Sequence, residues 1–219
     1  MVANDKVADF LPRFEKIKSE IIGEYVYLEP NLTIITEKVA IPEKVMNASD
    51  QDAFVKAIFG LHNGVFRMSP AIGDLVETSN NIAKINVADG SIMVECLTRS
   101  SVESSKMNMA YTLQSVFELA GFSVELSGSY PGWAPNMDSA ILKVMDGLYE
   151  RINGKKANVA ACHAGLECGI LGTNYPGMDM VSFGPTIKGA HSPDERASIS
   201  STKKFWDFVI EILKEIPVK

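Results

Sequence analysis

The chain has 219 residues, of which 46% are apolar and 22% are charged, close to the usage of ordinary globular proteins. This composition excludes a disordered chain, which combines low hydrophobicity with high net charge. The 21 basic and 27 acidic residues give a net charge of −6, and no cluster of Lys and Arg indicates a nucleic-acid partner. A chain of this length can bury a substantial core, as one large domain or two small ones.

Cysteine usage and hydropathy indicate the compartment. The three cysteines, Cys96, Cys162 and Cys168, are an odd number, which favours free thiols in a reducing environment. Residues 1–10 contain no apolar run of signal-peptide length, and no stretch approaches the roughly 20 apolar residues of a membrane span. We therefore expect a soluble cytoplasmic protein with no membrane partner.

The first 127 residues alternate between helical and strand-like patterns. In chain order, the patterns predict a helix over 5–23, a strand over 32–39, a helix over 50–61, strands over 74–78, 80–87 and 91–98, a helix over 102–120 and a strand over 122–126. Ala88-Asp89-Gly90 supplies the turn between the last two strands of the middle group, because Asp-Gly tolerates positive φ. This order predicts an α+β domain with an antiparallel sheet covered by helices on one face.

A change of composition marks a domain boundary. Residues 127–135, SGSYPGWAP, hold two glycines, two prolines and two serines, which is typical of a linker. The boundary divides the chain into domains over 1–127 and 128–219. Beyond it, the patterns predict a helix over 136–153, strands over 158–162 and 178–183, and a helix over 200–216. The second domain thus resembles the end of an α/β domain that lacks most of its sheet.

His191 is the first candidate for chemistry. It lies in a glycine-rich polar segment after a predicted buried strand, where a histidine can be a metal ligand or a general acid or base. The alternative is a surface histidine that hydrogen-bonds its own turn. No second histidine or carboxylate stands at H-x-x-x-H spacing, so the local sequence is not a metal motif. His62, which follows a predicted helix, is expected to be a turn residue.

Four further residues could contact a substrate. His163 lies in HAGLECG, residues 163–169, whose glycines allow a ligand to approach the backbone. Glu167 could pair with His163 or with a substrate amine. Cys168 and His163 could form a thiolate nucleophile and its base, although nothing nearby marks an electropositive site. Arg99 ends a predicted strand, where a guanidinium can bind a carboxylate with two hydrogen bonds or form a surface salt bridge.

Several motifs resemble one enzyme family. They are HAGLECG at 163–169, PGMDMVSFGPTI at 176–187, GAHSPDE at 189–195, NGV at 63–65, VETS at 76–79, CLTRS at 96–100 and YPGWAP at 130–135. Together they are similar to the C-terminal part of the aminoacyl-histidine dipeptidases, also called Xaa-His or cytosol non-specific dipeptidases. These are co-catalytic zinc exopeptidases related to carnosinases. The resemblance implies a lid domain over about 1–127, followed by the last part of a catalytic α/β domain.

The resemblance also implies roles for individual residues. His191 matches a zinc-ligand histidine, and Arg99 matches a lid arginine that binds the substrate's C-terminal carboxylate. His163 and Glu167 match a glycine-rich loop near the substrate pocket, so both are expected to bind substrate. The implied cofactor is zinc, with two ions in the complete enzyme, and the implied substrate is a dipeptide. No residue here matches the family's general base.

The chain departs from the family in its metal ligands. The family's His-x-Asp motif, bridging Asp, Glu-Glu pair and further Asp have no counterpart, so we expect the chain to begin inside the lid. Catalytic zinc takes about three protein ligands, and two-metal hydrolysis needs both ions in place. We therefore expect this chain alone to be inactive, as a truncated reading frame or half of a split protein. Exposed sheet edges would then favour self-association, as a homodimer through the lid, or complementation by an upstream half. The alternative is a non-catalytic, lid-type interaction module.

Overall fold

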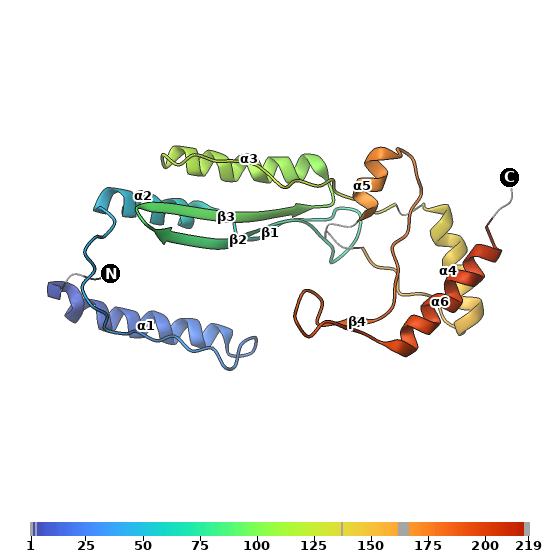
Figure 1. Cartoon of the computed structure of the whole chain (residues 1–219), viewed down its shortest axis with the longest axis horizontal. Coiled ribbons are helices and arrows are strands. Elements are labelled where there is room, and N and C mark those ends of the chain that lie inside the picture. Colours follow the sequence, from blue (N-terminus) through green and yellow to red (C-terminus); the bar gives the residue numbers. More distant parts are fainter. Residues whose placement is uncertain (1, 3, 137, 162–166, 217–219) are drawn as a thin grey trace. The chain divides into compact units, whose positions relative to one another are not determined.

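The structure is a computed structural model, and it describes residues 2, 4–136, 138–161 and 167–216. The chain divides into two compact units, residues 1–52 and 53–219 (Figure 1). The boundary predicted between residues 127 and 128 is a different division and stays a prediction.

The first unit contains one long helix. The short 3-10 helix η1 (Asn4–Lys6) leads into α1 (Val7–Tyr25), which confirms the helix predicted over 5–23. The strand predicted over 32–39 is wrong, because these residues form irregular chain. The side chains of Ile35 and Val39 are 73% and 69% exposed. A β-rich sequence becomes a strand only where a neighbour pairs with its backbone, and no described strand does so here.

A three-stranded antiparallel sheet organises the first part of the second unit. Helix α2 (Ala48–Gly60) precedes β1 (Gly64–Met68), β2 (Val76–Ala88) and β3 (Ser91–Ser100), which lie in the order β1-β2-β3. The strands predicted over 74–78 and 80–87 are in fact the single strand β2, and β1 was not predicted. Asp89 and Gly90 have φ of 52° and 76°, which confirms the predicted turn between β2 and β3.

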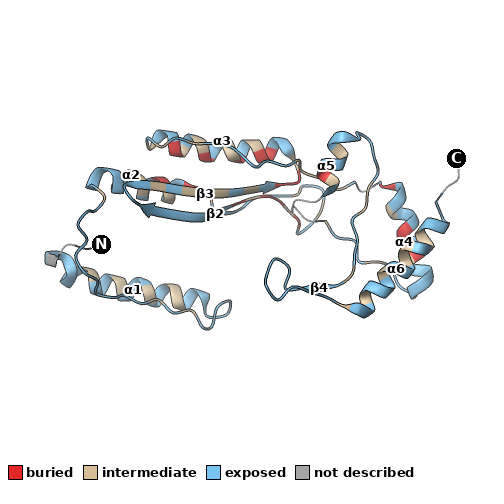
Figure 2. Ribbon diagram, in the orientation of Figure 1, coloured by how far each residue is buried: buried red, intermediate tan, exposed pale blue. Residues whose placement is uncertain are grey.

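Helices α2 and α3 (Glu103–Leu119) share one core with the sheet. Figure 2 shows the buried residues of α3 on the side that faces the sheet. The partly buried Ile82, Val94 and Cys96 pack against this cluster from one face of β2 and β3. The antiparallel sheet with helices on one face is therefore confirmed. The cluster's buried members are Ala57, Leu61, Met109, Leu113 and Phe117.

The rest of the second unit is helical, with one short hairpin. Its elements are α4 (Ala140–Asn153), α5 (Glu167–Asn174), β4 (Ile187–Lys188), β5 (Arg196–Ala197) and α6 (Ile199–Lys214). The helices predicted over 136–153 and 200–216 are confirmed over most of their length. Each begins at a serine cap: the hydroxyl of Ser139 accepts from the N–H of Leu142, and that of Ser198 from the N–H of Ser201.

Three further predicted strands are wrong among the described residues. Residues 122–126, 158–161 and 178–183 are irregular chain without ladder hydrogen bonds. Phe122 and Val124 nevertheless pack against the core of α2 and α3, so apolar residues in a strand-like pattern are partly buried there without pairing. In the part of the chain that the structure describes, no helix is long and apolar enough to cross a membrane.

Candidate functional site

A loop at residues 129–132 is held to α3 by a buried lysine. The Nζ of Lys106 lies 2.9 Å from the Oγ of Ser129, 2.6 Å from the carbonyl oxygen of Tyr130 and 2.8 Å from Oε2 of Glu103. Its side chain is only 10% exposed. An ammonium group has three N–H donors, so these three contacts satisfy it and fix the loop against the start of α3.

Two glycines let three elements meet at this loop. A Cβ on Gly132 would lie 2.7 Å from the carbonyl oxygens of Ser100 and Ser101, at the end of β3. A Cβ on Gly169, in α5, would lie 2.4 Å from the carbonyl oxygen of Pro131. Since no side chain fits at either distance, glycine is required for the close approach of the backbones. We call the meeting of β3, loop 129–132 and α5 the junction.

Two of the predicted substrate-binding residues adjoin the junction in the sequence. Arg99 directly precedes Ser100 in β3, Glu167 is the first residue of α5, and both are exposed. Within the described residues, the guanidinium of Arg99 has no ion-pair partner, so the surface salt bridge considered for it does not form there. His163 lies outside the described residues, as does Cys162.

A buried polar network lies beside Arg99, and sequence reasoning missed it. The Oγ1 of Thr78 lies 2.8 Å from the hydroxyl oxygens of both Ser100 and Ser105. One residue earlier, Glu77 is 4% exposed and forms an ion pair with the partly exposed Arg67, with Nε and Oε1 3.3 Å apart. A signal was available, because VETSNN at 76–81 is polar at successive positions rather than alternating like an ordinary half-buried strand.

His191 lies in the turn between β4 and β5. It has a φ of 64°, which is uncommon for a residue other than glycine, and its side chain is exposed. Its backbone N–H donates to Oε2 of Glu195 at 3.1 Å, and the N–H of Ser192 donates to the carbonyl oxygen of Gly189 at 3.1 Å. These bonds shape the turn through the backbone of His191 and leave its imidazole available to a ligand.

The described residues do not fit a complete metal centre. No group of three His, Cys, Asp or Glu side chains clusters among them. A catalytic zinc ion takes about three protein ligands, of which His191 could supply one. In the same turn, the carboxylate of Glu195 accepts from the backbone N–H of His191. Within the described residues, His191 is therefore a single candidate ligand rather than a metal site.

The described cysteines differ in their surroundings. Burial raises the pKa of the Cys96 thiol, and a hydrogen bond with Asn80 offsets part of this increase. Cys96 packs, partly buried, against the core of α2 and α3. Cys168 is half-buried in α5. The pairing considered for it with His163 stays a prediction.

The chain matches a known peptidase class. Peptidase family M20/M25/M40 matches residues 31–215, and the chain belongs to this family. The chain is 39% identical over all 219 residues to the cytosol non-specific dipeptidase of Escherichia coli (strain K12). It also matches the crystal structure of aminoacylhistidine dipeptidase from Vibrio alginolyticus over 98% of its length, with 41% identity and a TM-score of 0.81. The resemblance inferred from the motifs is thereby confirmed.

The chain spans less than half the length of these two relatives. It covers 45% of the Escherichia coli protein and 43% of the Vibrio alginolyticus chain. The fold described above is accordingly part of an M20 peptidase fold.

Proposed function

We propose that this chain forms the C-terminal part of a metal-dependent dipeptidase that hydrolyses Xaa-His and other dipeptides in the cytoplasm. In this proposal, residues 1–127 are a lid-type domain and residues 128–219 are the last part of the catalytic domain. The observation that carries the proposal is the 39–41% identity, over almost the entire chain, to two dipeptidases. The name of the Escherichia coli relative supports the cytoplasmic location.

The junction supports a role in substrate binding. A dipeptide has a free amine and a free carboxylate, and it needs one group of opposite charge for each. Arg99 can bind the carboxylate through two parallel N–H donors, which is the geometry that guanidinium favours. Glu167, which flanks the same junction, can pair with the amine, and His163 precedes it by four residues. We assign these three residues to substrate binding and none of them to bond cleavage.

His191 is proposed to be a zinc ligand contributed to a site that other polypeptide completes. Since the described residues offer one ligand, a zinc site with the usual number of ligands needs further donors. We therefore propose that the 219-residue chain does not turn over dipeptides by itself. The remaining donors would have to come from polypeptide outside these 219 residues.

The first test is hydrolysis of β-alanyl-histidine by the purified chain, with and without added zinc. We expect no turnover in either case. Turnover that a chelator abolishes would overturn the proposal, because it would reveal a complete metal site within this chain.

The second test uses the chain co-expressed with the part of the Escherichia coli dipeptidase that it does not match. We expect hydrolysis that Arg99→Ala lowers about 10- to 100-fold in kcat/KM, because a hydrogen-bonded charge pair contributes about 1.5–3 kcal/mol. The control is Arg13→Ala, on the exposed surface of α1, which should leave kcat/KM unchanged. Equal effects of the two changes would remove Arg99 from substrate binding, and unchanged activity of His191→Ala would remove His191 from the metal site.

A further inference from the structure

The first turn of α3 fastens the end of β3 that carries Arg99. The Oγ1 of Thr78, which is fully buried, lies 2.8 Å from the hydroxyl oxygens of both Ser100 and Ser105. Ser100 directly follows Arg99, and Ser105 lies in the first turn of α3. Since Ser100 and Ser105 are also buried, this bridge of three hydroxyls has little contact with water and holds the backbone beside Arg99 in one place.

The next residue of α3, Lys106, fastens loop 129–132. Its Nζ lies 2.6 Å from the carbonyl oxygen of Tyr130 and 2.9 Å from the Oγ of Ser129. The side chain of Lys106 is only 10% exposed, so water has little access to the ammonium group and these directional bonds fix the loop. Consecutive residues of one helical turn, Ser105 and Lys106, therefore hold both the end of β3 and the loop.

The same loop is in backbone contact with both β3 and α5. Gly132 approaches the end of β3, and Gly169 of α5 approaches Pro131, so closely that neither glycine could carry a side chain. A shift of the loop has to move at least one of these elements, because closely packed backbones leave no space to absorb it. Glu167 begins α5, two residues before Gly169, and therefore lies at the end of a path of contacts that starts at Lys106.

We propose that Lys106 is a positioning residue, which sets the spacing between Arg99 and Glu167 on which dipeptide binding depends. This inference rests on the proposed function, in which Arg99 binds the carboxylate of a dipeptide and Glu167 binds its amine. Two charged groups can hold both ends of one peptide only at a separation that matches its length. Misplacing a binding group by about 1 Å can cost a factor of about 100 in rate, so the spacing has to be held firmly. Lys106 itself does not contact the substrate in this proposal.

The test uses the chain co-expressed with the unmatched part of the Escherichia coli dipeptidase, and it compares two substrates. β-Alanyl-histidine has a carboxylate and an amine, whereas β-alanyl-histidinamide has no carboxylate for Arg99 to bind. On β-alanyl-histidine, Lys106→Met should lower kcat/KM about 10- to 100-fold, mainly by raising KM. On the amide, the loss should be less than about threefold, because the spacing matters only when both ends of the substrate are held.

Two further variants test the same dependence. In a chain that already carries Arg99→Ala, Lys106→Met should lower kcat/KM by less than about threefold, because residues that act as a unit are not additive. Ser129→Ala removes one acceptor of the Lys106 ammonium group and leaves the Tyr130 carbonyl in place, so it disturbs folding less. It should lower kcat/KM on β-alanyl-histidine about three- to tenfold and leave kcat/KM on the amide unchanged.

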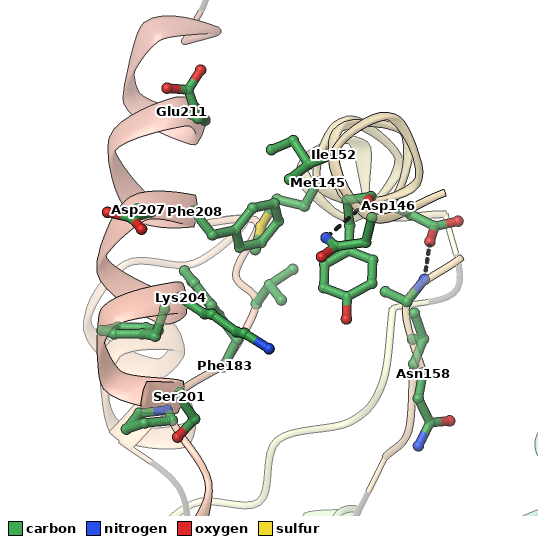
Figure 3. Close-up of a pocket in the computed structure, with 18 of the residues that line it drawn as sticks. Met145, Asp146, Ile152, Asn158, Phe183, Ser201, Lys204, Asp207, Phe208 and Glu211 are labelled. Atoms are coloured by element: carbon green, nitrogen blue, oxygen red, sulfur yellow. Dashed lines mark hydrogen bonds between the residues drawn. The ribbon is translucent and has the colours of Figure 1, made fainter. Parts of the chain in front are cut away.

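The matched control lies on α6, beside a groove of about 1040 Å³ between α4 and α6 (Figure 3). The Nζ of Lys203 lies 2.8 Å from Oδ2 of Asp207, which Figure 3 shows on this helix. Both residues belong to α6, so their ion pair fastens no second element. Lys203→Met should therefore leave kcat/KM unchanged on both substrates.

Hydrogen exchange of the chain alone gives a measurement that does not need hydrolysis. If Lys106 positions α5 through the loop, Lys106→Met should speed exchange at least about threefold both in loop 129–132 and in α5. Lys203→Met should change neither. Unchanged exchange in α5 beside a loosened loop would show that the glycine contacts do not transmit the position of Lys106, and it would overturn the proposal.

The outcomes separate positioning from the proposed function. A loss of kcat/KM confined to β-alanyl-histidine, together with faster exchange in α5, supports the positioning role of Lys106. Equal losses on the two substrates overturn it, because a variant that only destabilises the fold lowers both alike. A native pair that hydrolyses neither substrate counts against the proposed function, and in that case the exchange in α5 alone decides whether Lys106 sets the position of Glu167.

Discussion

The β2–β3 hairpin and the segment 178–183 both have strand-like sequences, but only the hairpin forms a ladder. Strands β2 and β3 are joined by the short turn at Asp89 and Gly90, so each strand has its pairing partner close by in the sequence. Segment 178–183 has no such neighbour among the described residues. Whether a segment forms a strand therefore depends on a pairing partner as much as on local propensity.

Burial also separates the sheet region, which contains β2 and β3, from the α4–α6 region, which contains segment 178–183. Helix α3 places Met109, Leu113 and Phe117 in the core that it shares with α2 and the sheet. Helix α6 is almost as long and has a clear apolar face, yet none of its residues is fully buried. The sheet region is therefore expected to hold most of the stability of this chain, whereas the α4–α6 region is expected to open at a lower free energy.

The largest expected effect comes from a core truncation that tests this contrast. Met109 is 0% exposed, so Met109→Ala should lower the free energy of unfolding by about 2–5 kcal/mol. Leu213 in α6 is 59% exposed, and Leu213→Ala should change the free energy of unfolding by less than about 0.5 kcal/mol. Urea denaturation followed by circular dichroism measures both. Equal losses of unfolding free energy would show that the apolar face of α6 is covered in solution. They would contradict the expected difference in stability between the two regions.

A smaller effect is expected where the two regions join. Lys106→Met removes the ammonium group that holds loop 129–132 and leaves the Tyr130 carbonyl without its donor. The expected cost is about 1–3 kcal/mol, with faster hydrogen exchange in the loop. The control is Lys203→Met, since Lys203 forms an exposed ion pair with Asp207 and should cost less than about 0.5 kcal/mol. An unchanged exchange rate in the loop would show that the two glycine contacts suffice to hold the junction.

Sequence patterns predicted the helices well and the strands poorly. Helical spacing is satisfied within one segment, so α1, α3, α4 and α6 were predicted close to their observed bounds. Among the described residues, the strands predicted over 32–39, 122–126, 178–183 and the first four residues of 158–162 do not form, because pairing depends on residues elsewhere, which no local pattern contains. Strand β1 was missed because GVFRM is too short and mixed to stand out, and its pairing with β2 defines it.

The candidate site was predictable only through its motifs. The spacing of Arg99 and Glu167 along the chain gives no indication that both adjoin the junction, because the backbone contacts of Gly132 and Gly169 form it. The buried network of Thr78, Ser100 and Ser105 was missed since each hydroxyl, taken alone, is an ordinary strand or helix-start residue. His191 was identified from its polar surroundings, and its place in a turn confirms only that it is accessible.

The smallest expected effect concerns the anchor between segment 178–183 and α4. Oδ2 of Asp179 accepts the N–H of Ile141 at 3.0 Å, and this bond, with one from the Ser139 hydroxyl, holds the pKa of Asp179 below its ordinary value. A lowered pKa in the folded state means that the contact stabilises the fold above the unfolded pKa of about 3.9. The stabilisation is lost as the pH falls through the folded pKa. Hydrogen exchange in the first turn of α4, corrected for intrinsic rates, should therefore quicken as the pH falls below about 4.

The variant Asp179→Asn isolates this contact from other effects of acid. It should remove the pH dependence in the first turn of α4, with a change of less than about tenfold in exchange, because a charge at an exposed helix terminus contributes little. Asp194→Asn is the control, since Asp194 lies in the exposed turn between β4 and β5 and should leave the dependence intact. Exchange in β2 and β3 should not respond to either variant. If the first turn of α4 keeps its pH dependence in Asp179→Asn, another group anchors segment 178–183, and the α4–α6 region is held together more firmly than this contact implies.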